Sequence, residues 1–136
     1  MLNRSLLLTL VVASAAAGAQ ALVASPEGFA ESLAKRQTFS GRTTWYPNDT
    51  GPDDCTGLTH LDSDIVVAMN LPQSGSCCGH SVHIIFNGRA ATARCVDFCR
   101  TCPSVGQLDV TKGLFEFFAD HLDVGVFTPT WSFVEE

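Results

Sequence analysis

The chain has 136 residues, of which 46% are hydrophobic and 16% are charged. This length suits one compact domain and is too short for two, and the hydrophobic content excludes a globally disordered chain. The formal net charge of −6, from 14 acidic and eight basic residues, argues against a nucleic-acid partner, because phosphate binding calls for a basic surface. Six cysteines in so short a chain indicate an oxidising compartment.

The N-terminal segment has the features of a secretory signal peptide. Arg4 precedes an apolar run over residues 6–17 that is too short to span a bilayer. Small residues then permit cleavage after Ala19 or after Ala21. We therefore expect a signal peptide over residues 1–21 and a secreted, extracellular protein that does not stay in the membrane.

A second processing signal follows. Lys35-Arg36 resembles a dibasic site for a furin-like protease, although an ordinary exposed basic pair is the alternative. Cleavage there makes residues 22–36 a propeptide and residues 37–136 the mature domain, with five basic and 12 acidic residues and a net charge of −7. Asn48 begins an N-glycosylation sequon in a loop rich in proline and glycine.

The remaining chain is dominated by short apolar or β-branched stretches typical of strands. We expect strands over residues 41–46, 65–69, 82–86, 90–97, 108–110 and 126–134. Asn87-Gly88 between two of them predicts a tight hairpin, because both residues tolerate positive φ. Thr111 can cap a helix over residues 112–122, whose apolar residues recur at inward spacing. Many short strands with one helix favour a small β-barrel over alternating strands and helices.

Several motifs occur in an informative order. They are Gly41-x-x-Thr44-Trp45-Tyr46, Cys55, Asp64-Ile65-Val66-Val67-Ala68, Cys78-Gly79, Asn87-Gly88-Arg89-x-x-Thr92-Ala93, Val96-Asp97-x-Cys99-x-x-Cys102, Leu108-Asp109-Val110-Thr111, Gly125-Val126 and Trp131-Ser132-Phe133. Together they resemble a fungal secreted single-domain protein of the rare lipoprotein A, expansin and barwin kind. The resemblance covers nearly all of residues 41–134 and implies a mainly β fold, a disulfide-bonded six-stranded double-psi β-barrel with one short helix. The chain departs from the pattern at Cys77, Cys95, His60 and Pro129.

Six cysteines allow 15 pairings, and the sequence alone selects none of them. The resemblance to the expansin barrel implies Cys55–Cys78 and Cys99–Cys102, with the two atypical residues, Cys77 and Cys95, bonded to each other. The alternative is a zinc site, in which Cys99-x-x-Cys102 combines with ligands drawn from Cys77, Cys78, His80 and His83. A secreted chain with an even number of cysteines favours disulfides, so we expect no metal and no cofactor.

The resemblance also implies a polysaccharide groove lined by Thr44, Tyr46, Asp97 and Asp109. Asp97 stands where related endoglucanases and lytic transglycosylases have a general acid, and it is the catalytic candidate if the protein is an enzyme. The structural alternative for Asp97 is a carboxylate that accepts N–H bonds from the loop after its strand. Hydrolysis needs a second carboxylate, and Asp49, two residues beyond the position expected for it, makes a hydrolytic pair doubtful.

We therefore expect an expansin-like monomer that acts non-hydrolytically on, or binds, a neutral or cationic cell-wall polysaccharide. A secreted protease inhibitor or host-interaction effector is the alternative, with an extracellular protein as partner and contacts from residues 47–54 and 73–77. A transglycosylase-like or other enzyme that uses Asp97 as its acid is a lesser alternative. Mutation of Asp97 separates these classes, because an inhibitor that acts through its loops does not need this side chain.

Overall fold

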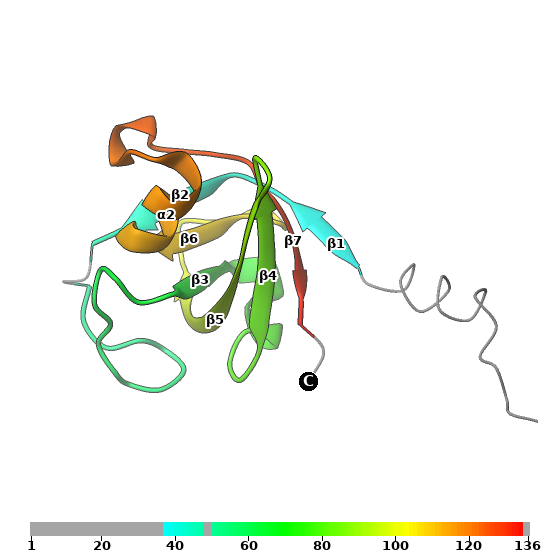
Figure 1. The fold of residues 1–136 in the computed structure, drawn as a ribbon. Coiled ribbons are helices and arrows are strands. Elements are labelled where there is room, and N and C mark those ends of the chain that lie inside the picture. Colours follow the sequence, from blue (N-terminus) through cyan, green and yellow to red (C-terminus); the bar gives the residue numbers. More distant parts are fainter. Residues whose placement is uncertain (1–36, 48–49, 135–136) are drawn as a thin grey trace, which may run out of the picture.

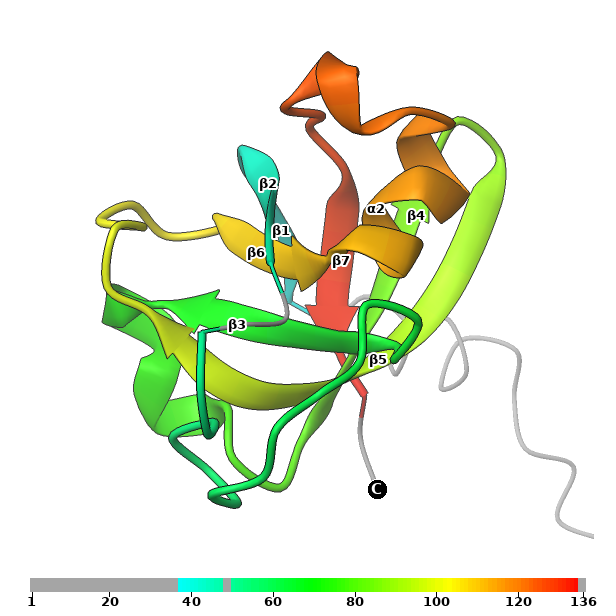
Figure 2. The same cartoon turned by 90° about the vertical axis from the view of Figure 1, so that its left-hand side faces the viewer.

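The computed structural model describes residues 37–47 and 50–134, which form one strongly curled sheet with helices at its margins (Figures 1 and 2). The strands are β1 (Thr38–Ser40), β2 (Thr43–Tyr46), β3 (Val66–Asn70), β4 (Ser81–Phe86), β5 (Arg89–Cys99), β6 (Leu108–Thr111) and β7 (Thr130–Phe133). The helices are α2 (Lys112–Ala119) and the 3-10 segments η1 (Leu71–Ser76) and η2 (Leu122–Val124). The predicted signal peptide, propeptide and Asn48 sequon lie outside the described residues.

The seven strands follow the order β1-β7-β4-β5-β3-β6-β2. The pairs β2/β6 and β3/β5 are parallel, and the other neighbours are antiparallel. β5 is long enough to pair with β4 through its first half and with β3 through its second half, where the register shifts between Val67 and Ala68. Bulges of this kind bend a strand and increase its twist, which accounts for the curl of the sheet.

Six strands were expected in this part of the chain, and the sheet has seven. The additional strand, β1, pairs antiparallel with β7, so its partner lies about 90 residues away along the chain. No local sequence pattern predicts this strand. The predicted strand over residues 126–134 is shorter than expected, because Pro129 lacks an N–H donor and the β7 pairing begins only at Thr130. Before the proline, Phe127 makes an isolated bridge to Thr43.

The predicted hairpin and helix are both present. Asn87 and Gly88 have φ of 48° and 74° and join β4 to β5, as the Asn-Gly pair predicts. The helix begins after Thr111 as expected, but the Thr111 hydroxyl donates to the Asp64 carbonyl rather than capping the helix. It ends at Ala119, earlier than predicted, because Asp120 takes a positive φ of 65°.

One aromatic and aliphatic core fills the inside of the curled sheet. Phe127 lies at its centre, with ring centroids 4.9 to 5.6 Å from those of Phe86, Phe115 and Phe118. Trp131 is the largest fully buried side chain. The helix contributes Leu114, Phe115 and Phe118, three of the positions predicted to face inward.

Three disulfides fasten the long loops to this core: Cys55–Cys78, Cys77–Cys95 and Cys99–Cys102. These are the pairs that the expansin resemblance implied, and they leave no thiolate for the alternative zinc site. The adjacent residues Cys77 and Cys78 serve two different bridges, since the first is fully buried and the second exposed. The Cys55–Cys78 and Cys77–Cys95 bridges join residues 23 and 18 positions apart, and closing a loop of this length stabilises a domain by roughly 3 kcal/mol. The Cys99–Cys102 bridge joins residues only three positions apart and constrains the unfolded chain less.

Two glycines permit a close backbone crossing between the β1–β2 turn and the loop before β6. A Cβ atom on Gly41 would lie 2.3 Å from the Gly106 carbonyl carbon, and one on Gly106 would lie 2.4 Å from the Ser40 carbonyl oxygen. Gly106 also has a φ of +88°, a region that residues with side chains rarely adopt. No other residue type fits either position without moving the backbone.

We predict that Gly41→Ala lowers the free energy of unfolding by roughly 2 to 4 kcal/mol, because the added methyl group meets backbone that cannot move aside. Denaturant unfolding measures the change. Gly75→Ala is the matched control, since a Cβ there meets nothing within 4 Å, and it should alter the stability by no more than about 0.5 kcal/mol. Equal stability of the two variants would contradict the close crossing.

Candidate functional site

A row of polar side chains crosses four neighbouring strands in register. Thr44 on β2 is the partner of Asp109 on β6, Asp109 is opposite Ala68 on β3, and Ala68 is opposite Asp97 on β5. The small Ala68 therefore separates the two carboxylates without filling the space between them. The sheet register thus brings together Thr44, Asp97 and Asp109, three of the residues predicted to share a groove.

The space over this row is an open pocket of about 230 Å³. It is lined by Tyr46, Thr50, Pro52, Asp54, Ala68, Asp97, Phe98, Cys99, Arg100, Thr101 and Asp109. We call this pocket the acidic groove, because three carboxylates and one guanidinium face it. Thr44 does not line it directly but donates a 2.7 Å hydrogen bond from Oγ1 to Oδ1 of Asp109.

Asp109 is held in a half-buried position at one side of the acidic groove. Burial raises its pKa, and the negative charge of Asp97 raises it further, whereas the Thr44 hydrogen bond and the Arg42 charge lower it. The net shift is upward, which keeps the carboxyl group closer to protonation than an exposed aspartate. Such a group accepts hydrogen bonds from a ligand hydroxyl and, when protonated, can also donate one.

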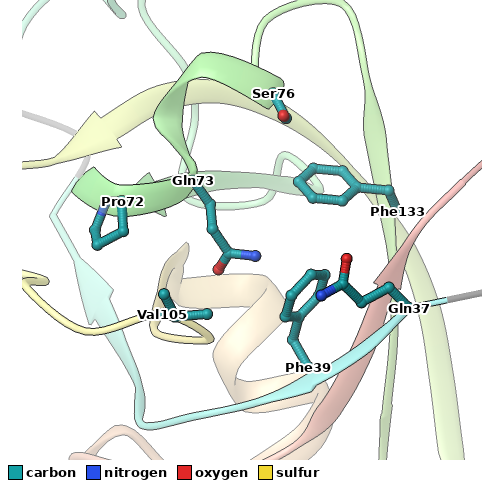
Figure 3. Close-up of a pocket in the computed structure, with 7 residues that line it drawn as sticks. All are labelled: Gln37, Phe39, Pro72, Gln73, Ser76, Val105 and Phe133. Atoms are coloured by element: carbon teal, nitrogen blue, oxygen red, sulfur yellow. The ribbon is translucent and has the colours of Figure 1, made fainter.

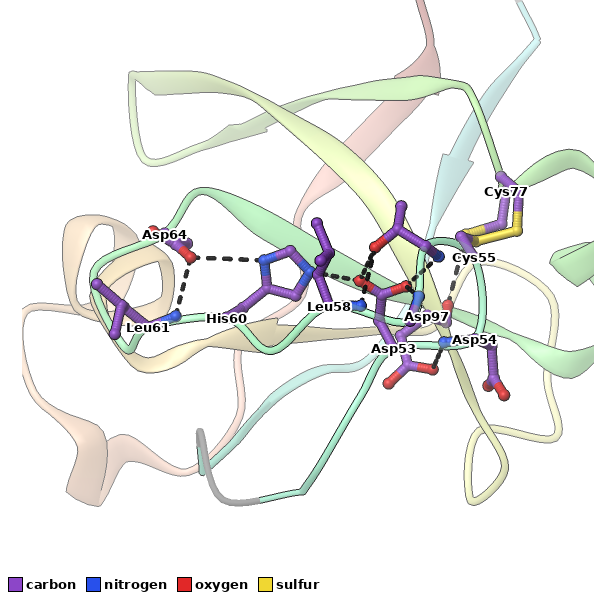
Figure 4. Close-up of polar contacts among 12 residues, drawn as sticks. Asp53, Asp54, Cys55, Leu58, His60, Leu61, Asp64, Cys77 and Asp97 are labelled. Carbon is purple, nitrogen blue, oxygen red and sulfur yellow. Dashed lines mark hydrogen bonds and ion pairs between the residues drawn. A yellow bond between two sulfur atoms is a disulfide. The ribbon is translucent and has the colours of Figure 1, made fainter.

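Asp97 lies near the end of β5, and hydrogen bonds join its side chain to the loop that carries Asp54. Its Oδ1 accepts the backbone N–H group of Asp54 at 3.1 Å (Figure 4). It also accepts the backbone N–H group of Phe98 at 2.9 Å. The Phe98 bond is the contact expected for a structural aspartate. Nevertheless the other face of the carboxylate lines the groove, so the side chain both stabilises the loop and is available to a ligand.

The sequence did not identify Asp54 as the partner of Asp97. Burial raises the pKa of Asp97, and a hydrogen bond from its side chain to the Asp54 carboxylate raises it further. The pKa of Asp54 is lowered instead. The largest cause is its hydrogen bond with Arg100, whose Nη2 lies 2.8 Å from Asp54 Oδ1, and the second is its interaction with Asp97. Of the two carboxyl groups, Asp97 is therefore the one closer to protonation, and when protonated it faces the groove as a donor.

Of the two adjacent aromatic residues on β2, Tyr46 faces the acidic groove and Trp45 faces the core. The Trp45 indole N–H donates a 3.2 Å hydrogen bond to the Leu122 carbonyl, and its ring packs against the main core cluster. Tyr46 packs against Ala68 and the Cys99–Cys102 bridge. Burial, followed by the charges of Asp97 and Asp109, raises the pKa of its hydroxyl, which therefore stays neutral and able to donate.

A buried polar cluster holds the loop that carries Asp54. The Asp53 side chain, 2% exposed, accepts hydrogen bonds from the backbone and hydroxyl of Thr56, from the Gly57 backbone and from Nε2 of His60 at 2.6 Å (Figure 4). The other ring nitrogen of His60 lies 3.4 Å from Asp64. His60, at a position where the resemblance has asparagine, thus spans two carboxylates and fixes the loop.

This cluster predicts a pH-dependent stability. Burial would raise the pKa of Asp53, but the hydrogen bonds from Thr56, His60 and Gly57 outweigh it and lower the pKa to about 2. A carboxylate whose pKa is lowered by folding contributes stability above its unfolded pKa of about 3.9 and loses it as the pH falls toward 2. The full contribution is roughly 2 kcal/mol at neutral pH.

We therefore expect the free energy of unfolding of Asp53→Asn to be roughly 2 kcal/mol lower than that of the natural protein at pH 7. This difference in stability should become smaller below a pH of about 3.5. Denaturant unfolding at several pH values measures this. Asp123→Asn, at an exposed position in η2, is the control and should leave the stability unchanged. A gap that stays constant from pH 7 to pH 2.5 would show that the Asp53 charge is not the cause.

The described residues contain neither a metal-ligand cluster nor a membrane-spanning helix. Among residues 37–47 and 50–134, no group of three His, Cys, Asp or Glu side chains could hold a metal ion. Within the same part of the chain, no helix is long and apolar enough to cross a membrane. Asp49, considered above as a second carboxylate, lies outside the described residues, as does Asn48.

Solved structures provide the comparison with known proteins. The Streptomyces papain inhibitor is similar with a TM-score of 0.61 and 30% identity, and the match covers 73% of this chain and 96% of the inhibitor. The apo expansin of Clavibacter michiganensis gives a TM-score of 0.64 at 22% identity, and a mutant of that expansin in complex with cellohexaose gives 0.63 at 22%. No protein-family model and no curated protein matches the chain.

These comparisons differ in what they show. The match to the inhibitor extends over almost its whole length, and the chain belongs to the same family as this inhibitor. The likeness to the expansins shows a shared fold, and it covers 73–74% of this chain but only 51–52% of theirs. This protein therefore spans about half the length of the expansin chains it resembles.

Proposed function

We propose that the protein is secreted and binds a neutral or cationic cell-wall polysaccharide in the acidic groove without hydrolysing it. The observation that carries this proposal is the register of Thr44, Asp109 and Asp97 across neighbouring strands beside Tyr46. Convergent carboxyl and hydroxyl groups beside an aromatic ring suit a ligand rich in hydroxyl groups. The expansin complex with cellohexaose supports the same class of ligand, because the fold is shared.

The arrangement of the acids favours binding over hydrolysis. Glycosidases place two carboxyl groups about 5 to 9.5 Å apart, on either side of the bond to be cleaved. Asp54 instead lies directly beside Asp97, with its backbone N–H 3.1 Å from Asp97 Oδ1 and its own carboxylate paired with Arg100, so Asp54 and Asp97 do not face each other across a glycosidic bond. Asp97 remains a possible lone acid for a transglycosylase-like reaction, which the experiment below distinguishes from binding.

We further propose that the sheet is a double-psi barrel. The two parallel pairs, β2/β6 and β3/β5, support this topology, because they place two similar strand pairs around a shared core. The three disulfides support secretion, since such bonds persist in oxidising compartments.

A sedimentation assay tests the groove. Protein expressed from the full sequence in a secretory host, with its disulfides intact, is mixed with insoluble glucan, chitin, cellulose or peptidoglycan, and released sugars are measured in the same tubes. We expect retention without sugar release, and roughly fivefold to tenfold weaker retention of Asp97→Asn, because one ligand hydrogen bond contributes about 1 kcal/mol.

Asp97→Asn is a mild substitution, since asparagine keeps the oxygen that accepts the Asp54 and Phe98 N–H groups. Asp123→Asn is the control for loss of one negative charge outside the groove. Sugar release that disappears in Asp97→Asn would make the protein an enzyme. Absence of retention on every polymer would overturn the polysaccharide proposal.

A second candidate function is inhibition of a papain-like protease. It rests on the Streptomyces papain inhibitor, which this chain matches at 30% identity over 96% of the inhibitor's length. On this proposal the contacts come from the loops at residues 47–54 and 73–77, and the carboxyl group of Asp97 takes no part.

Titration of papain with the protein tests this second function. An inhibitor should abolish hydrolysis of a small peptide substrate at a fixed molar ratio, and Asp97→Asn should inhibit as strongly as the natural protein. Unchanged papain activity at a large excess of protein would exclude papain as the target. Inhibition that requires Asp97 would place the protease contact in the acidic groove.

A further inference from the structure

A larger pocket lies apart from the acidic groove, between β1, the end of β7, η1 and the loop that precedes β6 (Figure 3). Its volume is about 540 Å³. It is lined by Gln37, Phe39, Pro72, Gln73, Ser76, Val105 and Phe133. We call it the neutral pocket, because none of these side chains carries a charge. It shares no lining residue with the acidic groove.

The side chain of Gln73 is fixed in an orientation that leaves a donor for a ligand. Its Oε1 accepts hydrogen bonds from the Asn70 side-chain amide, at 2.7 Å, and from the Gly106 backbone, at 2.8 Å. Asn70 is itself fully buried and donates to the Gln107 carbonyl at 2.9 Å. The amide nitrogen of Gln73 consequently points into the neutral pocket, toward the side where the Phe39 and Phe133 rings lie (Figure 3).

The aromatic wall of the neutral pocket is equally rigid. The rings of Phe39 and Phe133 pack against the buried Trp131, with centroid distances of 4.7 and 5.3 Å. The Trp131 indole N–H donates a 2.8 Å hydrogen bond to the Gly106 carbonyl. Gly106 therefore links the aromatic wall to the Gln73 amide, and the two sides of the pocket are held in place before any ligand arrives.

We propose that the neutral pocket is a second binding site, which accepts an uncharged sugar unit of a glycan. Aromatic rings present apolar faces to the C–H surface of a sugar, and amide and hydroxyl groups pair with its hydroxyls. An ionic ligand would find no counter-charge among the lining side chains. The volume is in the range of small-ligand sites, and the preformed walls reduce the entropy lost on binding.

This site goes beyond the proposed groove function and does not depend on it. The acidic groove offers carboxyl groups, and the neutral pocket offers amides, one hydroxyl and aromatic rings. Binding at either site can therefore be abolished without changing the other.

The two tryptophans provide separate reporters for the experiment. The indole N–H of Trp131 lies behind the neutral pocket, whereas that of Trp45 is hydrogen-bonded to Leu122 on another side of the core. Uniformly ¹⁵N-labelled protein with intact disulfides is titrated with cellohexaose and, separately, with chitohexaose. We expect saturable shifts of the Trp131 indole signal and the Gln73 side-chain signals, with the Trp45 indole unchanged.

Val105→Asp tests the pocket without touching the core, because Val105 lines it and is 55% exposed. The added charge should weaken the binding reported by Trp131 at least about tenfold, which corresponds to about 1.4 kcal/mol. Val124→Asp is the matched control, since Val124 is 50% exposed in η2 and is not a lining residue. This control and Asp97→Asn should both leave the Trp131 response unchanged.

The outcomes separate the two proposals. A Trp131 response without shifts in the acidic groove supports the neutral pocket even if the groove function fails. The pocket proposal is overturned if neither sugar moves the Trp131 signal at millimolar concentration, or if Val105→Asp responds like the natural protein. It is also overturned if only an uncharged, doubly capped tripeptide gives the response, because the pocket is then a peptide site.

Discussion

The arrangement of the molecule depends on one backbone crossing, at Gly106. Its carbonyl accepts the Trp131 indole, its N–H donates to Gln73, and its Cα packs directly against the Gly41 turn. These contacts join β7, η1 and the β1–β2 connection, three segments far apart in the sequence. Because the crossing is too tight for a Cβ atom, hydrogen bonds rather than side-chain packing determine how these segments meet.

The acidic groove depends on a different kind of constraint, the register of the sheet. Thr44, Asp109 and Asp97 lie in one row because two strand pairings place Ala68 opposite both acids and a third places Thr44 beside Asp109. The bulge in the β3/β5 pairing immediately before Ala68 is part of this alignment, since a slip of one residue would turn the side chains to the opposite face. Burial raises the pKa of both Asp97 and Asp109, and the charge of Asp97 raises that of Asp109 further.

Much of the fold could be predicted where the signals are local. Asn87-Gly88 specifies a hairpin through its own conformational preferences, and the spacing of Leu114, Phe115 and Phe118 specifies one helical face. β1 could not be predicted, because its pairing with β7 is decided by tertiary packing. Asp54 was missed for a similar reason, since its role arises from hydrogen bonds to Asp97 and Arg100, 43 and 46 residues away. Tyr46, Asp97 and Asp109, the predicted residues that line the groove, were identified through the family resemblance. Spacing or composition alone marks none of them.

The segment that follows β5 connects the two candidate sites. Its first residues, through Thr101, line the acidic groove. Further along, Val105 lines the neutral pocket, and the Gly106 N–H holds the Gln73 side chain in place. The Cys99–Cys102 bridge and the hydrogen bond from the Leu71 N–H to the Cys102 carbonyl fasten this segment to the end of β3. A glycan that occupied both sites would have to follow this fastened segment, so its affinity would depend on the conformation of the polymer as well as on the chemistry of each sugar unit.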